Sequence, residues 1–467
     1  MRWYRWKGCD VCGKFCQGCF DKQLRIDKLE ERLARVEAKL RYQERTALEK
    51  PFGASTPSSK ELVKPNTEEE KERRQGGAQP GHQGHGRRSI EPEEADEIIV
   101  IPAPERCPDC GGELVGNGEV GRTVKDIPEL EVRTVFYQIR RGYCSRCGKT
   151  VKASTLPVLP RGLLGNRLLA ETAMQHYVHG IPLSRLEEMW RINIGTLVKG
   201  FHLLRNLLIS VMPRLVKEYR EAAVKHADET GWRNNGHNGY AWIFLSDEVA
   251  LFCLRKTRSA NVPKEVLGTD ALPGTLVVDR YGAYNKAPCA LQYCYAHLLR
   301  DLEEMPAEFP QDDEVKAFAE EASPKLAAAI ELHSSSIADQ EYYPQAKLLE
   351  SQIKRIMNHC AQHPAVQSFQ NIFRDHADRL YHWATDRRVP ADNNFAEREL
   401  RPLVTARKVS FGSQSDEGAM TREVLMSVLH TMDLRGLPVA DRLKNALDRL
   451  AGDPNLDPYN LLFNDTS

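Results

Sequence analysis

The chain lacks net charge, a membrane-length apolar run and an apolar segment behind its basic amino terminus. Its 467 residues carry 65 Lys and Arg against 65 Asp and Glu. The longest apolar run, residues 203–212, is broken by Arg205 and Asn206 and is shorter than the roughly 20 residues that a membrane-spanning helix needs. No secretory signal is visible. These absences predict a cytoplasmic protein without a membrane partner, and the length predicts about three to four domains.

The neutral total hides an uneven distribution of charge. Residues 1–90 contain 20 Lys and Arg against 13 Asp and Glu, whereas residues 301–350 contain 3 against 13. The basic front end is suited to binding phosphate groups. The acidic block is either a solvated surface or an autoinhibitory one.

Strand-like patterns between Val224 and Tyr295 predict the centre of the fold. The expected order is three strands, a helix and two further strands: Val224–Asp228, Tyr240–Leu245, Val249–Leu254, Val262–Leu267, Thr275–Val278 and Leu291–Tyr295. Asp228 ends the first strand of this prediction, and Asp279 directly follows the fourth. This order is typical of an RNase H-like core, in which two neighbouring carboxylates hold divalent metal.

Glu397 is the third candidate ligand. A helical insertion is expected before it, and Asp392 or Asn393 can cap the helix that carries it. Two strand-borne aspartates and a helical glutamate could bind two divalent cations about 3.5–4 Å apart, as phosphodiester cleavage requires. Oxygen ligands favour Mg²⁺, or Mn²⁺ in its place.

Three nearby acids compete with these ligands: Glu229, Asp392 and Glu399. On a strand Glu229 would point to the opposite face from Asp228, and Glu399 would lie nearly across the helix from Glu397. Asp392 is better placed as a helix cap. The prediction therefore stays with Asp228, Asp279 and Glu397.

The twelve cysteines include two groups of four: Cys9, Cys12, Cys16 and Cys19, and Cys107, Cys110, Cys144 and Cys147. The second group forms two C-x2-C pairs, each followed by glycine, where the backbone must turn beneath a metal. It predicts a zinc ribbon with a hairpin strand at residues 131–140. The first group either binds zinc or consists of redox or adventitious cysteines.

The segment between the cysteine groups predicts a short helix and a linker. Four apolar residues recur at steps of four, three and four: Leu29, Leu33, Val36 and Leu40. They indicate either a dimerising zipper or one amphipathic helix that packs on its own chain. Residues 51–90 are typical of a linker, whose basic end, with Arg87 and Arg88, either follows a DNA backbone or is only solvated.

Residues 163–219 are helical by pattern and contain a helix pair. Residues 182–190 and 196–204 flank a short turn, with the dimensions of a helix-turn-helix motif. Lys199 and His202 would lie on the exposed side of the second helix and contact DNA, although a plain three-helix unit has the same pattern.

Other basic side chains flank the predicted metal site. They are DNA-contact candidates beside Glu397, or surface ion-pair partners: Arg398, Arg401, Arg407 and Lys408. His297 and Arg300, after the fifth predicted strand, are further candidates for contact with DNA or support of the site.

The prediction as a whole is a multidomain α/β protein. It has a cysteine cluster with a zipper-like helix, a basic linker, a zinc ribbon, a helix-turn-helix domain, an RNase H-like core interrupted by a helical insertion, and a helical end. The expected ranges are 1–50, 51–90, 91–158, 159–220, 221–301 with 389–415 for the core, 302–388 for the insertion, and 416–467.

Several of these stretches together resemble the bacterial DDE transposases of insertion sequence family sixty-six, the large catalytic protein of that element. They extend from Gly76 to about Leu450 and are Gly77–Arg87, the Cys107 to Cys147 pairs, His226–Thr230, Val278–Tyr284, Tyr295–Arg300 and Asp392–Arg398. The chain departs from the family at its front, where the Cys9 to Cys19 cluster precedes the zipper-like segment.

The resemblance implies that Asp228, Asp279 and Glu397 are the catalytic triad. It also implies a DNA-associated bacterial enzyme that cuts the terminal inverted repeats of its element and joins them to target DNA. Homo-oligomers and small accessory proteins of the element are expected partners. The alternatives are a catalytically inactive, zinc-containing DNA-binding protein and a nuclease without strand transfer.

Overall fold

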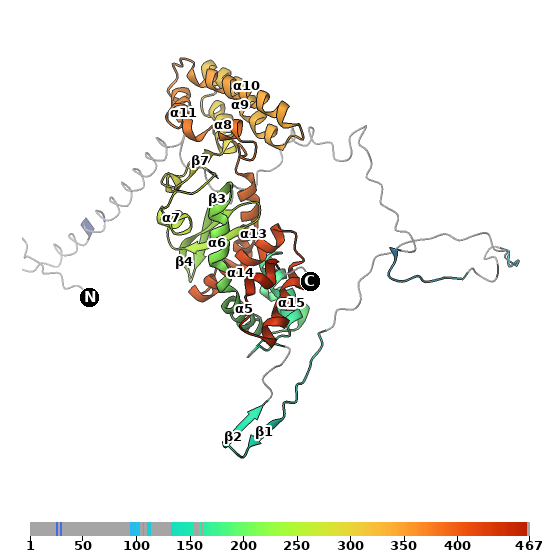
Figure 1. Ribbon diagram of the computed structural model, residues 1–467. Coiled ribbons are helices and arrows are strands. Elements are labelled where there is room, and N and C mark those ends of the chain that lie inside the picture. The colour runs from blue at the N-terminus through green and yellow to red at the C-terminus, as the bar shows by residue number, and fades with distance from the viewer. Residues whose placement is uncertain are drawn as a thin grey trace, which may run out of the picture. The chain divides into compact units, whose positions relative to one another are not determined.

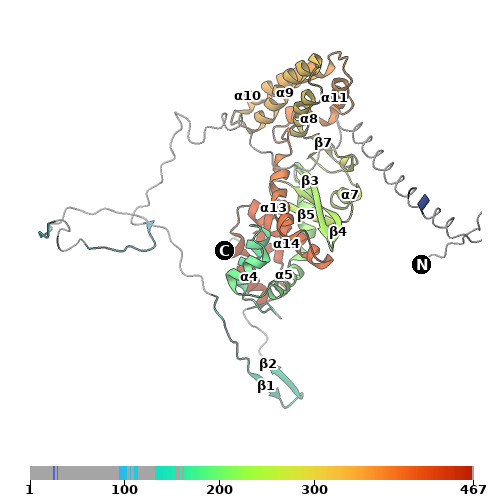
Figure 2. The ribbon, with the colours of Figure 1, turned by 180° about the vertical axis from the view of Figure 1, so that it is seen from behind.

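The computed structural model describes residues 25, 26, 29, 94–102, 106, 110–113, 132–152, 158–159 and 162–464 (Figures 1 and 2). The chain divides into two compact units, residues 61–140 and the remainder. Several predictions lie outside the described residues: the Cys9 to Cys19 cluster, Leu33, Val36 and Leu40 of the zipper-like seam, Arg87 and Arg88 of the linker, and Cys107.

A five-stranded mixed sheet forms the centre of the larger unit. Its order is β5-β4-β3-β6-β7, for β3 (Val224–Asn234), β4 (His237–Leu245), β5 (Ala250–Arg255), β6 (Thr275–Val278) and β7 (Ala290–Tyr293). The first three strands pair antiparallel, and β6 is parallel to both β3 and β7. Helix α7 (Asn261–Leu267) connects β5 to β6. The predicted sequence of elements is confirmed, and the sheet is consistent with an RNase H-like core.

Strand β3 is longer than the sequence pattern predicted. It continues for six residues beyond Asp228 and turns into β4 at Asn235 and Gly236, whose φ angles are 49° and 76°. Asn-Gly with two positive φ angles is the preferred two-residue hairpin turn. The prediction that β3 ends at Asp228 is therefore wrong, and this aspartate lies within the strand.

Helix α14 (Asp416–Leu434) covers the outer edge of the sheet. Its side chains accept hydrogen bonds from alternate backbone N–H groups of β5, at 3.1 Å from Ala250 to Thr431 Oγ1, 2.9 Å from Phe252 to Ser427 Oγ and 3.1 Å from Leu254 to Glu423 Oε2. An open edge strand is a template for pairing with another chain. The helix satisfies these donors and blocks the edge.

Helices from before and after the sheet in the chain pack together in the larger unit. They are α3 (Asn166–Tyr177), α4 (Leu183–Trp190), α5 (Ile194–Leu208), η3 (Ile209–Val211), α6 (Met212–Glu221), α14 and α15 (Val439–Gly452), with a short π-helix, η6 (Asn460–Asn464), after them. Figures 1 and 2 place α4, α5, α14 and α15 together at one end of the unit. The predicted helix pair is present as α4 and α5.

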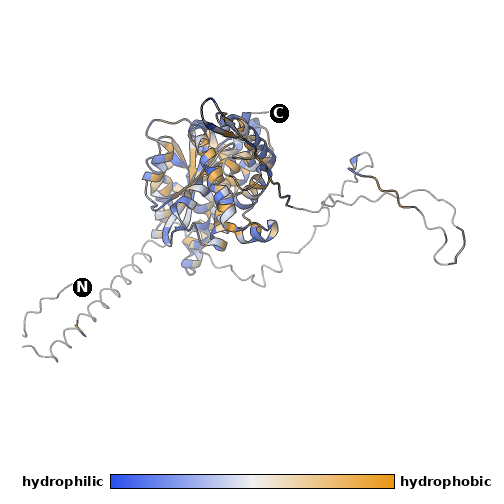
Figure 3. Cartoon of the chain, turned by 90° about the horizontal axis from the view of Figure 1, so that it is seen from below, coloured by the Kyte–Doolittle hydropathy of each residue, from blue (hydrophilic) through white to orange (hydrophobic). Residues whose placement is uncertain are grey.

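Among the described helices, residues 194–221 form one stretch long and apolar enough by composition to cross a membrane. Core helices of soluble proteins can have the same length and composition, and Leu197, Leu204 and Leu208 of this stretch are buried. Figure 3 shows apolar and polar residues interspersed along the helices of the folded body. This mixture is expected of helices with one face packed inward.

A helical lobe lies beyond β7, at the opposite end of the unit (Figure 1). It contains α8 (Tyr295–Glu308), α9 (Asp313–Ser334), α10 (Asp339–Asn358), α11 (Pro364–Asp375), η5 (Ala377–Arg379) and α12 (His382–Thr385). The chain leaves and re-enters the core at adjacent points, because Tyr295 N–H donates to Ala391 O at 2.7 Å. After the lobe comes α13 (Asn394–Ser410), the helix that carries Glu397.

The hairpin near the second cysteine group is displaced from its predicted position. Strands β1 (Arg141–Cys144) and β2 (Lys149–Lys152) pair antiparallel around the Cys144–Cys147 turn. Residues 132–140 form no strand, so the hairpin strand predicted at residues 131–140 is wrong for the described part. No other described residue pairs with residues 132–140 as a strand.

Candidate functional site

Asp228, within β3, and Asp279, directly after β6, both lie just beyond the parallel pairing of these two strands. The parallel register pairs His226 with Val277, so each aspartate follows a paired residue by two positions. Strand β6 ends at Val278, and beyond it the β3 backbone has no strand neighbour on that side. The two aspartates therefore lie near the carboxyl end of β6, where its pairing with β3 stops.

Burial raises the pKa of both carboxyls. For Asp228, burial is the main cause and the charges of Glu229, Asp279 and Glu397 add to it. For Asp279, burial also dominates, although the Tyr281 N–H, which donates to Oδ1 at 2.9 Å, opposes it. Two anions forced together in this way favour a bound cation.

Asn393 positions the start of α13 against β3. Its side-chain N–H donates to Ala227 O at 2.9 Å, and its Oδ1 lies 2.9 Å from His226 Nδ1. Its backbone N–H donates to Cys294 Sγ at 3.1 Å. Asn393 is the N-cap residue, but its side chain makes no capping hydrogen bond, because it is directed into the core instead.

Asp392 accepts hydrogen bonds from Asn394, from the backbone N–H at 3.3 Å and from the side chain at 2.6 Å. It thus braces the start of α13 without occupying the N-cap position that the sequence offered it. Glu397 follows in the first turn. Its carboxyl pKa is raised mainly by burial, with further contributions from Asp392 and Asp279.

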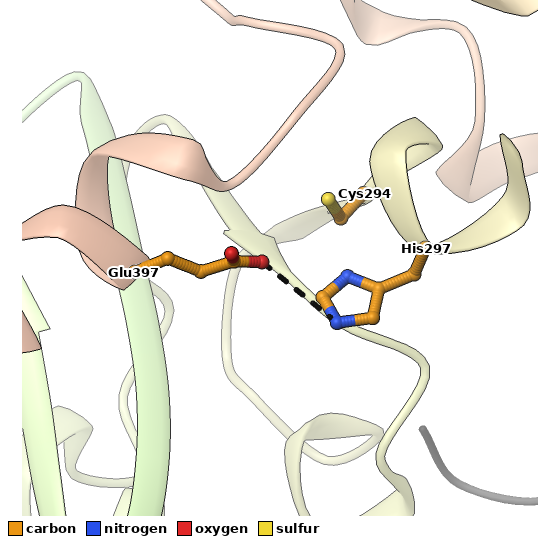
Figure 4. Close-up of side chains that lie close together, drawn as sticks. All are labelled: Cys294, His297 and Glu397. Carbon is orange, nitrogen blue, oxygen red and sulfur yellow. Dashed lines mark ion pairs between the residues drawn. The ribbon is translucent and has the colours of Figure 1, made fainter. Parts of the chain in front are cut away.

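Glu397 faces His297 and Cys294, as Figure 4 shows. His297 Nε2 lies 3.8 Å from Glu397 Oε1, and the three potential ligand atoms lie within 4.8 Å of one another. Burial raises the pKa of the Cys294 thiol to about 12, and it lowers the pKa of His297 to about 4, assisted by Arg300 and Arg280. The cluster is therefore a neutral thiol and a neutral imidazole beside a carboxyl group.

Glu397 Oε1 is buried and has no hydrogen-bond partner among the described residues. A buried acceptor without a partner loses its hydration without compensation. Asp228, Asp279 and Glu397 are near enough for the charge of Glu397 to raise the pKa of Asp228. Among the described residues, however, only Cys294, His297 and Glu397 form a group whose ligand atoms all lie within 4.8 Å of one another. The three carboxylates are hard oxygen donors of the kind that Mg²⁺ and Mn²⁺ prefer, whereas the protonated Cys294 thiol does not favour a soft-metal site.

Glu229 is excluded as a metal ligand by its own contacts. Arg258 Nε donates to its Oε1 at 2.9 Å and the Tyr284 hydroxyl donates to Oε2 at 2.5 Å. Its side chain is only 1% exposed. The alternation along β3 predicted that Glu229 points away from Asp228, and its contacts with Arg258 and Tyr284 agree with that prediction. Nothing in the sequence around Arg258 indicated that this arginine pairs with Glu229.

The basic candidates around Glu397 differ in their surroundings. The side chains of Arg398, Arg401 and Lys408 are exposed, and the charges of Arg300 and Arg401 lower the pKa of Glu397. Arg407 instead donates to Gly231 O at 2.5 Å and to Thr230 Oγ1 at 3.1 Å. It ties α13 to β3.

The two candidates on α5 also differ. Lys199 is exposed, but His202 is only 21% exposed and its Nδ1 lies 2.7 Å from Thr421 Oγ1 of α14. The prediction that His202 faces solvent is therefore wrong. The helix-period pattern could not show that α14, more than 200 residues later, covers this side.

The described cysteines of the second group have the local geometry expected of zinc-binding turns. Gly111 and Gly148, which follow Cys110 and Cys147, have φ angles of 73° and 67°. The Gly148 N–H donates to Cys144 O at 2.9 Å. Hydrogen bonds from Cys147 lower the pKa of the Cys144 thiol, which favours the thiolate that binds metal.

In metal-free protein, Asp228→Asn should stabilise the fold. The pKa of Asp228 in the folded protein lies above its ordinary value of about 4. The free energy of unfolding therefore falls as the pH rises from about 4 through the raised pKa, because the buried carboxyl must lose its proton. We expect the amide to increase the free energy of unfolding by about 1–3 kcal/mol above this range, and to leave it unchanged below pH 4. Urea unfolding in a chelator between pH 4 and 8 measures the difference, with exposed Asp270→Asn as the control. A wild type that is the more stable at pH 8 would contradict this account.

The fold class follows from the sheet and its surroundings: a mixed α/β core consistent with the RNase H-like enzymes that process nucleic acids. Residues 161–421, more than half of the chain, match the model of the Transposase IS66 family, and the chain belongs to that family. The resemblance inferred from the motifs is confirmed. Membership makes the chain a transposase, an enzyme that acts on DNA, and implies the use of divalent metal.

The chain is also similar to curated proteins of Sinorhizobium fredii (strain NBRC 101917 / NGR234). It is 24% identical to the uncharacterized protein y4qI over 77% of this chain and 73% of the relative. It is 22% identical to the uncharacterized protein y4hP, over 78% and 74% of the two chains. Both similarities extend over most of each protein.

Proposed function

We propose that the chain is a DDE-type transposase in which Asp228, Asp279 and Glu397 hold divalent metal, with Mg²⁺ as the natural ion and Mn²⁺ as a substitute. The observation that carries the proposal is the buried Oε1 of Glu397, which has no hydrogen-bond partner among the described residues. The raised pKa values of Asp228 and Asp279 support it, and the Glu397 charge contributes to that of Asp228. Metal bound there would activate an attacking water or 3′ hydroxyl and stabilise the leaving oxygen.

The protein's own residues would hold this site in shape. Asn393 fixes the Glu-bearing helix to β3, while the Tyr281 N–H orients Asp279. Arg258 holds Glu229 away from the metal. The neutral His297 would support Glu397 without neutralising the charge that metal requires.

DNA would be held by several surfaces. We propose that the exposed Arg398, Arg401 and Lys408 contact phosphates near the reacting bond, with Arg300 behind them. The pair α4 and α5, with Lys199, would act as the helix-turn-helix element that binds the terminal repeats. Arg407 and His202 would position α13 and α5 rather than contact DNA.

The proposal is tested by joining labelled terminal DNA to a target duplex. Purified protein should join the ends in Mg²⁺ or Mn²⁺ and should not join them in a chelator. Joining that persists without metal would overturn the metal mechanism. A gel shift in the same chelator addresses the alternative, since DNA binding without joining in any divalent metal would favour an inactive DNA-binding protein.

We further propose that Cys107, Cys110, Cys144 and Cys147 hold one structural Zn²⁺, on the strength of the two glycine turns. The full-length protein should contain at least about one equivalent of zinc at these residues, because tetrahedral thiolate sites bind zinc tightly. Cys144→Ser with Cys147→Ser should remove about one equivalent, measured by metal analysis. Cys360→Ser, at an exposed cysteine of the helical lobe, is the control. Unchanged zinc content in the double variant would refute the ribbon.

The remaining proposals concern assembly. The predicted domain ranges, a homo-oligomeric active complex and assistance from small proteins of the element are consistent with a transposase that must hold two DNA ends together. The seam at Leu29 to Leu40 is the proposed dimer contact. Sedimentation of the Leu33→Lys, Leu40→Lys protein measures it.

A further inference from the structure

A cavity of about 360 Å³ opens beside the helix pair. Its buried floor includes His176, Tyr177, Phe201 and Arg422, and its exposed rim includes Ser184, Val409 and Gln414. The walls come from α3, α4 and α5 on one side, and from the end of α13, the following segment and α14 on the other. No Asp or Glu is among the described residues that line it.

Arg422 is a buried cation without an anion. Its exposed fraction is 8%, and no described carboxylate forms an ion pair with it. Its guanidinium donates to His176 Nε2 at 3.1 Å and lies 5.3 Å and 5.4 Å from the ring centroids of Tyr177 and Trp232. The part-buried Arg258, in contrast, has a carboxylate partner in Glu229.

The imidazole of His176 cannot supply the missing negative charge. Its Nδ1 lies 2.7 Å from Ile181 O, so Nδ1 carries the proton and Nε2 accepts from Arg422. Burial and the Arg422 charge lower the pKa of His176 to about 3. The histidine is a neutral partner, and the positive charge at the cavity floor is uncompensated.

The cavity rim adds hydrogen-bonding groups suited to an anion. Ser410, Ser413, Gln414 and Thr421 line the cavity. The hydroxyls of Ser410 and Thr421 already donate to Ala406 O and Glu417 O. The Ser413 hydroxyl accepts from Trp232 Nε1 at 3.1 Å and keeps its own proton available to a ligand. A guanidinium binds phosphate through paired hydrogen bonds, and a cavity of this size is at the small end of those that hold nucleotide-sized ligands.

We propose that this cavity is a phosphate-binding site in which Arg422 is the charge partner, and that it receives a phosphate-bearing group such as a nucleotide. The phosphate comes either from an unpaired stretch of DNA or from a free ligand. Its position favours DNA, because the cavity is lined by α4 and α5 and by the end of α13. Ala406 on its wall lies about 13 Å along the α13 axis from Glu397.

The site is tested by thermal unfolding of the full-length protein in a chelator, so that the result does not depend on the carboxylate metal site. One arm adds 10 mM inorganic phosphate against sodium chloride of equal ionic strength. The other adds a short single-stranded oligonucleotide. The proteins compared are wild type, Arg422→Met, Val409→Trp to fill the rim, and Arg214→Gln as an exposed control on α6.

We expect the unfolding equilibrium of wild type and Arg214→Gln to shift about tenfold when ligand is present at ten times its Kd. Arg422→Met should lack this shift, while being at least as stable as wild type without ligand, because the unpaired charge is gone. Val409→Trp should lose the shift although Arg422 remains, which tests the site even if Arg422→Met fails to fold.

The two arms identify the source of the phosphate. A shift with the oligonucleotide alone assigns the site to DNA, and a shift with inorganic phosphate alone assigns it to a free ligand. The proposal is overturned if wild type responds to neither, or if Arg422→Met and Val409→Trp respond as wild type does. In the last case the stabilisation comes from other basic surfaces.

Discussion

Replacing Asp228, Asp279 or Glu397 with its amide should reduce strand transfer at least about a thousandfold. The amide keeps the shape of the side chain but removes a charged oxygen ligand, and the loss of several kcal/mol of transition-state stabilisation has this scale. The measurement is Mg²⁺-dependent joining of labelled terminal DNA to a target duplex. Each variant should still bind the terminal DNA in a chelator, because binding depends on the basic surfaces and the helix pair.

The matched controls are the neighbouring acids. Glu399→Gln and Asp392→Asn should retain most of the joining activity, because neither is needed to hold metal. A Glu397→Gln protein that still joins ends, while Glu399→Gln does not, would show that the third ligand has been misassigned. Full joining activity in all three amide variants would show that these carboxylates do not form the catalytic site.

Asn393→Ala should lower the joining rate about a hundredfold, with the carboxylates intact. The substitution removes the bonds to Ala227 O and His226, and a displacement of about 1 Å in the helix that bears Glu397 has this effect on a positioned reaction. The free energy of unfolding should fall by about 1–3 kcal/mol, because the Ala227 carbonyl is left buried without this partner. Joining assays and urea unfolding measure the two effects.

Asn394→Ala is the control for this experiment. The Asn394 side chain donates to Asp392 and makes no contact with β3 that resembles those of Asn393, so its loss should change joining only a few-fold. High Mn²⁺ should recover part of the Asn393→Ala activity, as expected for a displaced ligand rather than a missing one. Equal losses of joining rate in the two variants would show that joining depends on the local structure at the start of α13, and not on the attachment of α13 to β3.

The sequence predicted the sheet because its signals are local. Alternating and apolar runs mark β3 to β7, and the helix at 262–267 stands between them as expected. The extension of β3 was missed although Asn235-Gly236 is a hairpin signal, because the polar residues that follow Asp228 break the apolar pattern. Burial of Thr230 and Trp232 comes from α13 and α14, which no local pattern contains.

The sequence supplied the candidate ligands but not the residues that position them. Local patterns singled out Asp228, Asp279 and Glu397, although Asp228 lies within β3 and not at its end, and their role in catalysis remains a proposal. Asn393 and Arg407 look like an ordinary cap and a basic surface residue. Each reaches a backbone group more than 150 residues away, so their roles depend on how α13 docks, which is a property of the folded chain.

The hydrogen bond from Tyr295 to Ala391 closes the chain beneath the helical lobe. A segment whose ends are already joined in the core can change its length at low entropic cost, since doubling a flexible loop adds only about 0.6 kcal/mol. The part of the lobe beyond α8, the helix that holds His297 near Glu397, can thus be shortened, lengthened or exchanged between relatives without moving the carboxylates. It is the natural junction for chimaeric enzymes that combine one catalytic core with different lobes.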